Sequence, residues 1–422
     1  MDLVREITFY GFSFISLYVQ VFFLVVFIER RKDLLVRTEA IELPDYPGVT
    51  ITIPAYNESH NIEKTVKSLL ELDYPQDKLF IYIVDDGSTD DTWEVMQQYK
   101  DFPNIKLFTK PNGGKYTANN LGLENSTTPF VGCLDSDSMV HPQALKRIMT
   151  YFFSKDVMAV APTIVTHEPK TFVQRAQAVE YDFSIFVKKM LSFVDAIHVT
   201  PGPFSIFRKE VFEQLGPYRH AHNTEDQEIA LRMKQNHMKI EHAPDAFVYT
   251  IGPPTVKGLY NQRLRWIYGF LKNVLDYRHL LFRRQYGNIG FITLPSGIVS
   301  ALSVIFLFFF ASYNIINYIW HKALAVSATG TVFNTSVISK VDWFYVPTNA
   351  VLFITILVYI AVFNSLFIGQ KIKTGKIKLS FNIILFFFVY SIVAPFWLMK
   401  AIYNTVRGYE ASWTKERDAR GI

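Results

Sequence analysis

Residues 79–92 have the sequence LFIYIVDDGSTDDT, and this segment predicts the architecture of the residues around it. Leu79–Val84 is a short apolar run of the kind that forms a buried strand. Asp85-Asp86-Gly87 then ends the strand, and Asp90–Tyr99 is typical of a helix. A strand, an acidic turn and a helix in this order indicate an α/β unit, in which ligands bind at the carboxyl ends of the strands.

The same alternation continues on both sides of this segment. Short apolar or β-rich runs predict further strands, and apolar residues at helical spacing predict the helices between them. The strands are expected at Val49–Ile53, Ile105–Phe108 and Phe130–Leu134, and the helices at Ser59–Leu72 and Tyr116–Glu124. We therefore expect one soluble α/β domain with a mostly parallel, Rossmann-like sheet over residues 45–255.

Membrane-length apolar segments flank this domain. Phe9–Ile28 carries no charged residue and is long enough to cross the hydrocarbon core. A signal peptide is the alternative, but the run is long for one and no small-x-small cleavage site follows it. We predict a transmembrane helix within residues 1–32, amphipathic interfacial helices within 256–286 and transmembrane helices within 287–405.

Basic residues predict the orientation of the domain. Glu29-Arg30-Arg31-Lys32 follows the first apolar run, which places the soluble domain in the cytoplasm by the positive-inside rule. The basic linker Lys371–Lys378 is expected on the same side. A third C-terminal crossing would put the basic tail, residues 406–422, outside. We therefore expect a re-entrant or broken helix at Ala394-Pro395, which returns the tail to the cytoplasm.

The composition excludes several other classes of protein. Half of the 422 residues are apolar, 37 of them are Phe, and a net charge of +5 gives no case for nucleic acid as a partner. No basic-aromatic platform for single strands stands out. Cys133 is the single cysteine, so an internal disulfide cannot form, and no Cys/His cluster has zinc spacing.

Two acidic clusters follow expected strands. In Asp135-Ser136-Asp137 the two carboxylates are at i and i+2, so in an extended strand they converge and repel unless a cation lies between them. Mg²⁺ or Mn²⁺ held with substrate phosphate oxygens is the usual solution, and a solvated turn is the alternative. Asp85-Asp86-Gly87 suits either a nucleotide base and ribose or a tight turn with an N-cap.

Thr224-Glu225-Asp226 begins a helix that is expected to run to Gln235. Thr224 with Gln227 matches a capping box, and acids in the first turn suit the helix dipole, so a structural role explains the tripeptide. The functional interpretation makes Asp226 a general base, which must be ionised and close to an incoming hydroxyl.

The amphipathic segment Val256–Leu275 contains the sequence QRLRW at residues 262–266. Gln262, Arg265 and Trp266 share one helical face. An interfacial helix with a snorkelling Arg and an anchoring Trp is one interpretation. The other uses Arg265 as a fixed cation for diphosphate and Trp266 as a flat surface on which a sugar ring stacks.

Two further loops suit an anionic nucleotide. In Asn112-Gly113-Gly114-Lys115 the glycines let backbone amides approach an anion and Lys115 adds charge, although Walker A spacing is missing. Tyr56 and Glu58, after the first expected strand, are placed to hold a nucleoside.

The order of these motifs resembles the processive, membrane-embedded family 2 glycosyltransferases, which include cellulose, chitin, hyaluronan and poly-N-acetylglucosamine synthases. The matching segments are PAYNE (54–58), VDDGSTDDT (84–92), NGGK (112–115), LDSD (134–137), GPF (202–204), TED (224–226) and QRLRW (262–266). TED followed by QxxRW and membrane spans is a specific signature, whereas all relatives with the GT-A fold share the earlier segments. The single N-terminal span and the tail with Ser412-Trp413 look most like poly-N-acetylglucosamine synthases, and GPF looks closer to hyaluronan synthases.

The resemblance implies a GT-A catalytic domain between transmembrane helices of a multi-pass cell-membrane protein. It implies inverting transfer from a UDP-sugar, above all UDP-N-acetylglucosamine, to a growing polysaccharide, with Mg²⁺ or Mn²⁺. The implied residues are Asp226 as catalytic base; Tyr56, Glu58, Asp86, Lys115, Asp135 and Arg265 at the donor; Gly202, Pro203, Glu225, Gln262 and Trp266 at the acceptor; Asp137 with Asp135 at the metal; and Trp413 in a gating element.

Two alternatives stay open. A non-processive enzyme would use the same donor site to add one sugar to a lipid acceptor. A transporter or receptor with an α/β regulatory domain would turn over no donor at all.

Overall fold

The computed structural model describes residues 2–34, 42–329 and 350–409. Its centre is an eight-stranded sheet in the order β3-β2-β1-β4-β7-β6-β8-β5. The strands are β1 (Val49–Ala55), β2 (Leu79–Asp85), β3 (Ile105–Thr109), β4 (Phe130–Cys133), β5 (Ser138–Val140), β6 (Val157–Thr166), β7 (Ile206–Arg208) and β8 (Lys239–Thr250). Trp413 and the rest of the tail from residue 410 lie outside the described residues, so the predicted gating element does too.

The parallel part of the sheet places the acidic clusters. Strand β1 pairs in parallel with β2 and β4, and β2 pairs in parallel with β3. Parallel strands end on the same edge of a sheet, so the loops after β1, β2 and β4 lie next to one another. Strands β7 and β5 pair antiparallel to their neighbours, and the sheet is therefore mixed and mostly parallel, as the sequence predicts.

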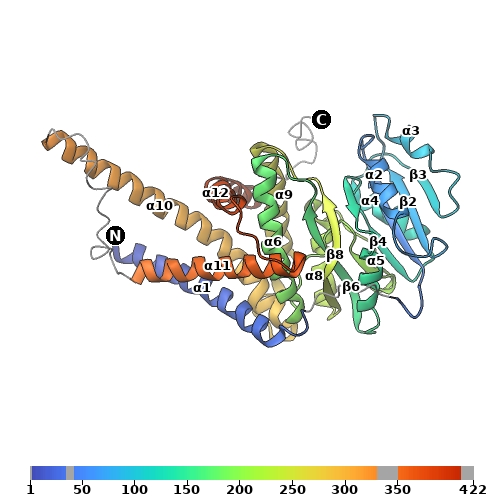
Figure 1. Cartoon of the computed structure of the whole chain (residues 1–422), viewed down its shortest axis with the longest axis horizontal. Helices are drawn as coiled ribbons and strands as arrows, with labels where there is room; N and C mark the ends of the chain where they lie inside the picture. The colour runs from blue at the N-terminus through green and yellow to red at the C-terminus, as the bar shows by residue number, and fades with distance from the viewer. Residues whose placement is uncertain (1, 35–41, 330–349, 410–422) are drawn as a thin grey trace.

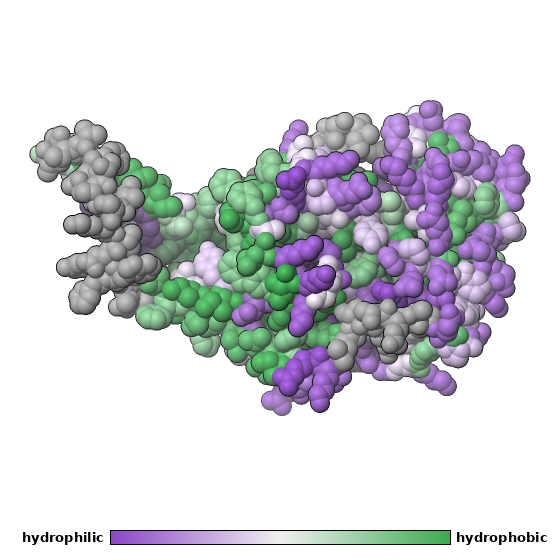
Figure 2. Space-filling model, in the orientation of Figure 1, coloured by the Kyte–Doolittle hydropathy of each residue, from purple (hydrophilic) through white to green (hydrophobic). Residues whose placement is uncertain are grey.

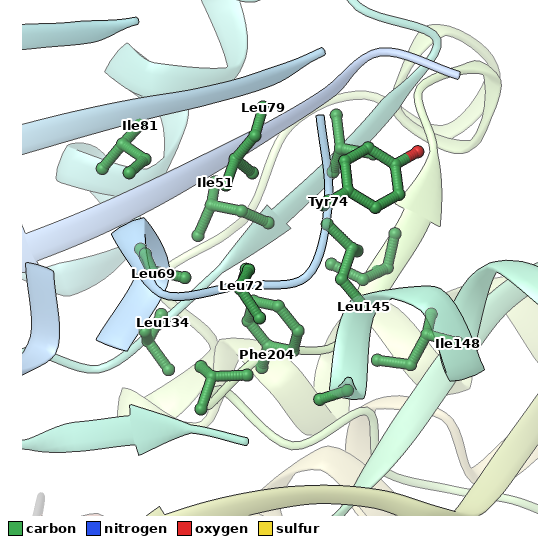
Figure 3. Close-up of a cluster of buried hydrophobic side chains, with 14 of the residues drawn as sticks. Ile51, Leu69, Leu72, Tyr74, Leu79, Ile81, Leu134, Leu145, Ile148 and Phe204 are labelled. Carbon is green, nitrogen blue, oxygen red and sulfur yellow. The ribbon is translucent and has the colours of Figure 1, made fainter. Parts of the chain in front are cut away.

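Helices cover both faces of the sheet (Figure 1). Those of the soluble part are α2 (Ile62–Leu70), α3 (Thr92–Gln97), α4 (Lys115–Asn125), α5 (Ala144–Tyr151), α6 (Phe172–Phe193), α7 (Glu210–Leu215), α8 (Glu225–Gln235) and α9 (Val256–Asp276). Figure 3 shows the core between β1, α2 and α5, where Ile51, Leu69 and Leu145 meet and are completely buried. Each such side chain stabilises the fold by roughly 1.5–3 kcal/mol, which fixes the strands that carry the acidic loops.

Four apolar helices project from this domain: α1 (Asp2–Arg30), α10 (Leu294–Thr329), α11 (Ala350–Thr374) and α12 (Asn382–Arg407). In the described residues four segments are long and apolar enough to cross a membrane; three lie within α1, α11 and α12, and the fourth, Ile289–Ala328, begins just before α10. The helices α1, α10 and α11 extend away from the sheet (Figure 1), and their surfaces are largely hydrophobic (Figure 2). Short turns at Arg278–Leu280, Arg284–Tyr286 and Ile289–Thr293 join α9 to α10.

Helix α12 differs from the other three apolar helices. The expected break at Ala394-Pro395 is wrong, because the helix continues from Asn382 to Arg407 with Pro395 in its interior. A proline inside a membrane-facing helix is tolerated where neighbouring helices pack around it. In Figure 1 α12 is seen almost end-on whereas α11 runs across the view, so α12 lies across the direction of α11.

Candidate active site

Lys115 lies at the centre of a cluster of charged side chains. It is the first residue of α4 and follows Gly114, whose φ of 90° favours glycine. Its Nζ lies 2.5 Å from Oδ1 of Asp135, after β4, and 3.4 Å from Oε1 of Glu225, the first residue of α8. Burial lowers the pKa of Lys115, but the two carboxylates outweigh it and hold the pKa well above its ordinary value. Lys115 is therefore a permanent cation between two acidic loops.

Asp226 lies beside this cluster. Its Oδ2 accepts a hydrogen bond from the Gly202 amide at 3.2 Å, and its Oδ1 accepts one from the Gln227 amide at 2.9 Å. Burial, followed by the charge of Glu225, raises the pKa of Asp226 to about 6, although Lys115 opposes the increase. A carboxylate with this pKa is mostly ionised at neutral pH and is basic enough to accept a proton.

Gly202 forms the floor of the cluster. A Cβ at this position would lie 2.5 Å from Nζ of Lys115 and 3.3 Å from Oδ1 of Asp135, so only glycine leaves room for the ion pair. The carbonyl of Gly202 accepts a hydrogen bond from the Cys133 thiol at 2.8 Å, and Pro203 is half-buried beside it. Burial raises the pKa of the Cys133 thiol to about 12, so it packs as a neutral group.

Asp86 is bound by the protein's own donors. Its Oδ1 accepts hydrogen bonds from Lys110 Nζ at 2.6 Å and the Gly113 amide at 3.1 Å, and its Oδ2 accepts one from the Gly114 amide at 2.8 Å. The side chain is 5% exposed. The glycine amides that the sequence suggests for a bound anion thus contact Asp86, which fixes the glycine loop beside the end of β2.

The loop after β1 is joined to the loop after β2. The Asn57 amide donates to Ser88 Oγ at 2.8 Å, and the Thr89 amide donates to Asn57 Oδ1 at 2.7 Å. Glu58 accepts a hydrogen bond from Asn61 at 2.9 Å, and the Tyr56 ring is exposed. Tyr56, Glu58 and the loop of Asp86 therefore lie on the same edge of the sheet as the Lys115 cluster.

Thr224 has a different role from the one its sequence suggests. Its side chain makes no capping hydrogen bond to α8, so the predicted capping box is wrong. The hydroxyl instead donates to the Ala221 carbonyl at 2.9 Å and accepts from Asn273 of α9 at 2.9 Å. A Cβ on Gly269 would lie 2.3 Å from this hydroxyl. Thr224 is therefore the point at which α9 docks on the start of α8.

This docking brings the QRLRW segment to the acidic cluster. Arg265 donates to the Asn223 carbonyl at 3.1 Å, and its charge is among those that lower the pKa of Asp226. Gln262 accepts a hydrogen bond from Arg263 at 2.6 Å, and the Arg263 guanidinium lies over the Trp266 ring, 4.1 Å from its centre. The structure thus places Arg265 beside Asp226 and orders Gln262 and Trp266 around Arg263.

Asp137 faces a different set of neighbours. Its Oδ1 accepts a hydrogen bond from Ser138 at 3.3 Å, and its charge acts on the Tyr181 hydroxyl of α6. Within the described ranges no group of three or more His, Cys, Asp or Glu side chains has the arrangement of a complete metal site. Asp135 and Asp137 still fit Mg²⁺ or Mn²⁺, because these ions take hard oxygen ligands and are often bound by one or two carboxylates plus substrate phosphates.

The structure adds charged residues that the sequence did not single out. Burial lowers the pKa of Lys188 of α6 to about 8, against the opposing charges of Asp226 and Glu180. Burial and then Lys188 lower the pKa of His198 to about 4, so this imidazole is neutral. The available signal was a helix that mixes long apolar side chains with charged residues such as Glu180 and Lys188.

Part of this chain matches a known protein family and proteins of one name. Residues 50–216 match the family model described as glycosyl transferase family 2. A poly-beta-1,6-N-acetyl-D-glucosamine synthase from Staphylococcus epidermidis is 29% identical over 244 residues, which are 57% of this chain and 58% of the relative. The enzyme of the same name from Staphylococcus aureus strain COL is 29% identical over 234 residues, 54% of this chain and 56% of the relative. This chain therefore covers less than two thirds of these relatives.

A solved structure confirms the fold. The mannosyltransferase PcManGT from Pyrobaculum calidifontis, in complex with GDP-Man and Mn²⁺, superposes with a TM-score of 0.53 at 19% identity. The match covers 84% of this chain and 98% of that chain. The predicted GT-A fold, flanked by apolar helices, is thereby confirmed.

Proposed function

We propose that this protein, whose residues 50–216 match the glycosyl transferase family 2 model, polymerises a UDP-activated sugar into a β-linked polysaccharide at a membrane. The observation that carries the proposal is the position of Asp226. It is a carboxylate with a pKa of about 6, and it lies among Lys115, Asp135 and Arg265 at the carboxyl ends of the parallel strands. That edge is where a sheet of this kind binds its ligand.

The chemistry assigned to these residues is an inverting transfer. As the acceptor hydroxyl attacks the anomeric carbon of the donor, Asp226 takes its proton and the bond to the diphosphate oxygen breaks, with the electron pair leaving on UDP. Positive charge develops on the sugar ring and negative charge on the diphosphate. Arg265 and Lys115 are fixed cations beside this site, and fixed charges placed where charge develops lower the barrier.

Asp137, helped by Asp135, is the residue assigned to a divalent metal, which would supply Lewis-acid neutralisation of the diphosphate. PcManGT holds Mn²⁺ together with GDP-Man on the same fold, which supports this assignment. Asp135 pairs with Lys115 through one carboxylate oxygen, and its second oxygen would be the ligand to the metal.

N-acetylglucosamine is the sugar we propose, because the relatives that match over more than half of this chain are poly-beta-1,6-N-acetyl-D-glucosamine synthases. The donor is then UDP-N-acetylglucosamine, and Tyr56, Glu58 and Asp86 are assigned to its uridine. Gly202, Pro203, Glu225, Gln262 and Trp266 are assigned to the acceptor. Transfer of a single sugar to a lipid acceptor is the second candidate, and the apolar helices at the domain favour neither one.

The helix directions support a cytoplasmic catalytic domain. We assign α1, α10 and α11 as membrane crossings and α12 as a helix that lies along the membrane surface, because it lies across α11 (Figure 1). With three crossings, the domain, the basic linker Lys371–Lys378 and the tail are all on one side. This arrangement obeys the positive-inside rule without a broken helix.

The deciding experiment measures product size. Membrane vesicles that contain the full chain receive radiolabelled UDP-N-acetylglucosamine, UDP-glucose or UDP-glucuronate, and the products are separated by length. A ladder of polysaccharide from UDP-N-acetylglucosamine, absent with Asp226→Asn, is the expected result. A single-sugar lipid product would replace the proposal with the second candidate, and no product from any donor would refute both.

Orientation is tested separately. Cys133 is buried, and Cys133→Ser gives a background without cysteine into which Lys376→Cys is introduced. A membrane-impermeant maleimide should label residue 376 in inside-out vesicles and leave it unlabelled in intact cells. The reverse pattern would place the linker outside and contradict the assigned crossings.

A further inference from the structure

We propose that Arg263 is a positioning residue that holds Gln262 and Trp266 in place, and that α12 sets Arg263 through Tyr390 and Glu180. This inference rests on the proposed function, because it concerns the acceptor face of the same enzyme. It assigns a role to the second residue of QRLRW, to an acid in α6 and to a tyrosine in the last apolar helix.

The contacts form one connected network. Arg263 Nε donates to Glu180 Oε1 at 3.2 Å, and a second nitrogen of the same guanidinium donates to Glu180 Oε2. The Tyr390 hydroxyl donates to Glu180 Oε2 as well. The remaining guanidinium nitrogen donates to Gln262 Oε1 at 2.6 Å, and the flat face lies 4.1 Å from the centre of the Trp266 ring.

Because Arg263 is buried, its charge requires the partners in this network. The Arg263 side chain is 4% exposed, and a buried cation is tolerated only when it is paired and hydrogen-bonded. Glu180 pairs with Arg263 in a bidentate geometry, which the planar guanidinium of arginine allows and the ammonium of lysine does not. Burial lowers the pKa of Arg263, but Glu180 outweighs it and the pKa lies above its ordinary value. Arg263 therefore stays charged and keeps one orientation.

Apolar packing fixes the distance between the three helices. Leu259 of α9 and Val173 of α6 are buried in one cluster with Val389 and Trp397 of α12. The Tyr390 ring packs edge-on against Trp397, with ring centres 5.7 Å apart. This packing holds Tyr390 of α12 in hydrogen-bonding contact with Glu180 of α6.

The network also reaches the metal side of the site. Tyr181, next to Glu180 on α6, feels the charges of Arg263, Glu180 and Asp137. Arg263 thus acts on Tyr181 as well as on the acceptor residues Gln262 and Trp266. The predicted consequence is that loosening α12 weakens acceptor binding far more than donor binding, because the residues assigned to the donor lie after β1, β2 and β4 and on α4, and only Arg265 lies on α9.

The test uses three variants of the full chain in detergent or vesicles. Tyr390→Phe removes only the hydroxyl, Glu180→Gln removes the charge at nearly the same shape, and Arg263→Lys keeps the charge without the planar fork. Tyr359→Phe, on the half-exposed face of α11, is the matched control for loss of a helix tyrosine hydroxyl. KM for a short N-acetylglucosamine oligosaccharide, KM for UDP-N-acetylglucosamine, and kcat are measured for each.

We expect the acceptor KM to rise about tenfold for Glu180→Gln and Arg263→Lys and roughly threefold for Tyr390→Phe, on the scale of a lost hydrogen bond to a charged group. The donor KM should change less than twofold, and Tyr359→Phe should match the wild type. An unchanged acceptor KM, or an equal rise in both KM values, would overturn the inference even if the melting temperature fell.

A second measurement separates this inference from the proposed function. Calorimetry of the oligosaccharide binding to the protein without donor reports acceptor affinity directly. If the wild type binds the oligosaccharide but transfers no sugar, the proposed function fails, and the comparison between wild type and Tyr390→Phe still decides the role of α12. If the wild type polymerises normally and all variants bind the oligosaccharide as it does, only the inference fails.

Discussion

Replacing Lys115 by methionine removes the cation at the centre of the acidic cluster while keeping most of the side-chain volume. Lys115 pairs with Asp135 and Glu225, and its charge is one of the two that oppose the increase in the pKa of Asp226. Without Lys115, the charges of Glu225 and Asp135 act on Asp226 with no neighbouring ammonium to offset them. All of these effects raise the pKa of Asp226, so the sign of the shift is fixed.

The size of this pKa shift follows from the distance between the charges. At an effective dielectric constant of 20, two unit charges interact by about 4 kcal/mol at 4 Å and by about 2 kcal/mol at twice that separation. The larger separation applies, because Lys115 contacts the neighbouring Glu225 and no hydrogen bond joins it to Asp226 among the contacts described. About 2 kcal/mol corresponds to ~1.5 pKa units, so the pKa of Asp226 moves from about 6 to about 7.5.

The assay is UDP release from pH 5 to pH 9 at saturating metal and donor. In the wild type the rate should rise with pH and level off above about pH 6, because the base must be ionised. In Lys115→Met the rising part of this pH–rate profile, the rising limb, should lie ~1.5 pH units higher. Lys110→Met is the matched control, because Lys110 pairs with Asp86 instead, so it should lower turnover without moving the limb. A limb that stays in place or moves to lower pH in Lys115→Met would refute the electrostatic argument.

Three further predictions concern the same site. Asp226→Asn should lower transfer by roughly a thousandfold or more. At pH values above 6 it should also raise the melting temperature, because the folded protein raises the pKa of this carboxyl to about 6 and its ionised form therefore costs stability. A lower melting temperature at these pH values would contradict the sign of this effect. Treatment with a chelator should abolish UDP release, and either Mg²⁺ or Mn²⁺ should restore it, whereas full activity after exhaustive chelation would remove the metal from the assignment. Gly269→Ala should push α9 away from Thr224, since its Cβ would lie 2.3 Å from the hydroxyl, and so should lower both transfer and thermal stability; Gly11→Ala in α1 is the control, because nothing lies near its Cβ and its backbone is helical.

The sequence was sufficient for the elements whose determinants are local. Leu79–Val84 and Phe130–Leu134 are short apolar runs, and both form buried strands at the positions expected, β2 extending to Asp85 and β4 ending at Cys133. Parallel pairing of strands then brings Asp86 and Asp135 to one edge without any further information. The order of the motifs therefore placed the loops correctly before any tertiary contact was known.

The contacts that depend on partners far apart in the chain could not be predicted in the same way. Thr224 satisfies the spacing of a capping box, but Asn273, some fifty residues later, takes its hydroxyl instead, because α9 packs directly on the start of α8. The amides of Gly113 and Gly114 suit any anion, and only the fold shows that Asp86 is the one they contact. Glu180 and Arg263 carry no recognisable spacing at all, because they meet across two helices.

Helix α12 shows most clearly what hydropathy leaves undetermined. A helix that crosses a bilayer needs about 20 apolar residues, and a helix that packs on a protein at the membrane surface can have as many, so apolar length alone does not separate the two. Their neighbours differ: 28% of the most apolar segment of α12 is buried, compared with 17% in each of α1, α10 and α11. Helix α12 packs against both α6 and α9 of the catalytic domain, and its buried residues include Trp397, whose neighbour Tyr390 reaches Glu180. An apolar helix that gives part of its surface to the enzyme in this way is well placed to transmit the state of the membrane side to the acceptor residues, and a helix surrounded by lipid alone is not.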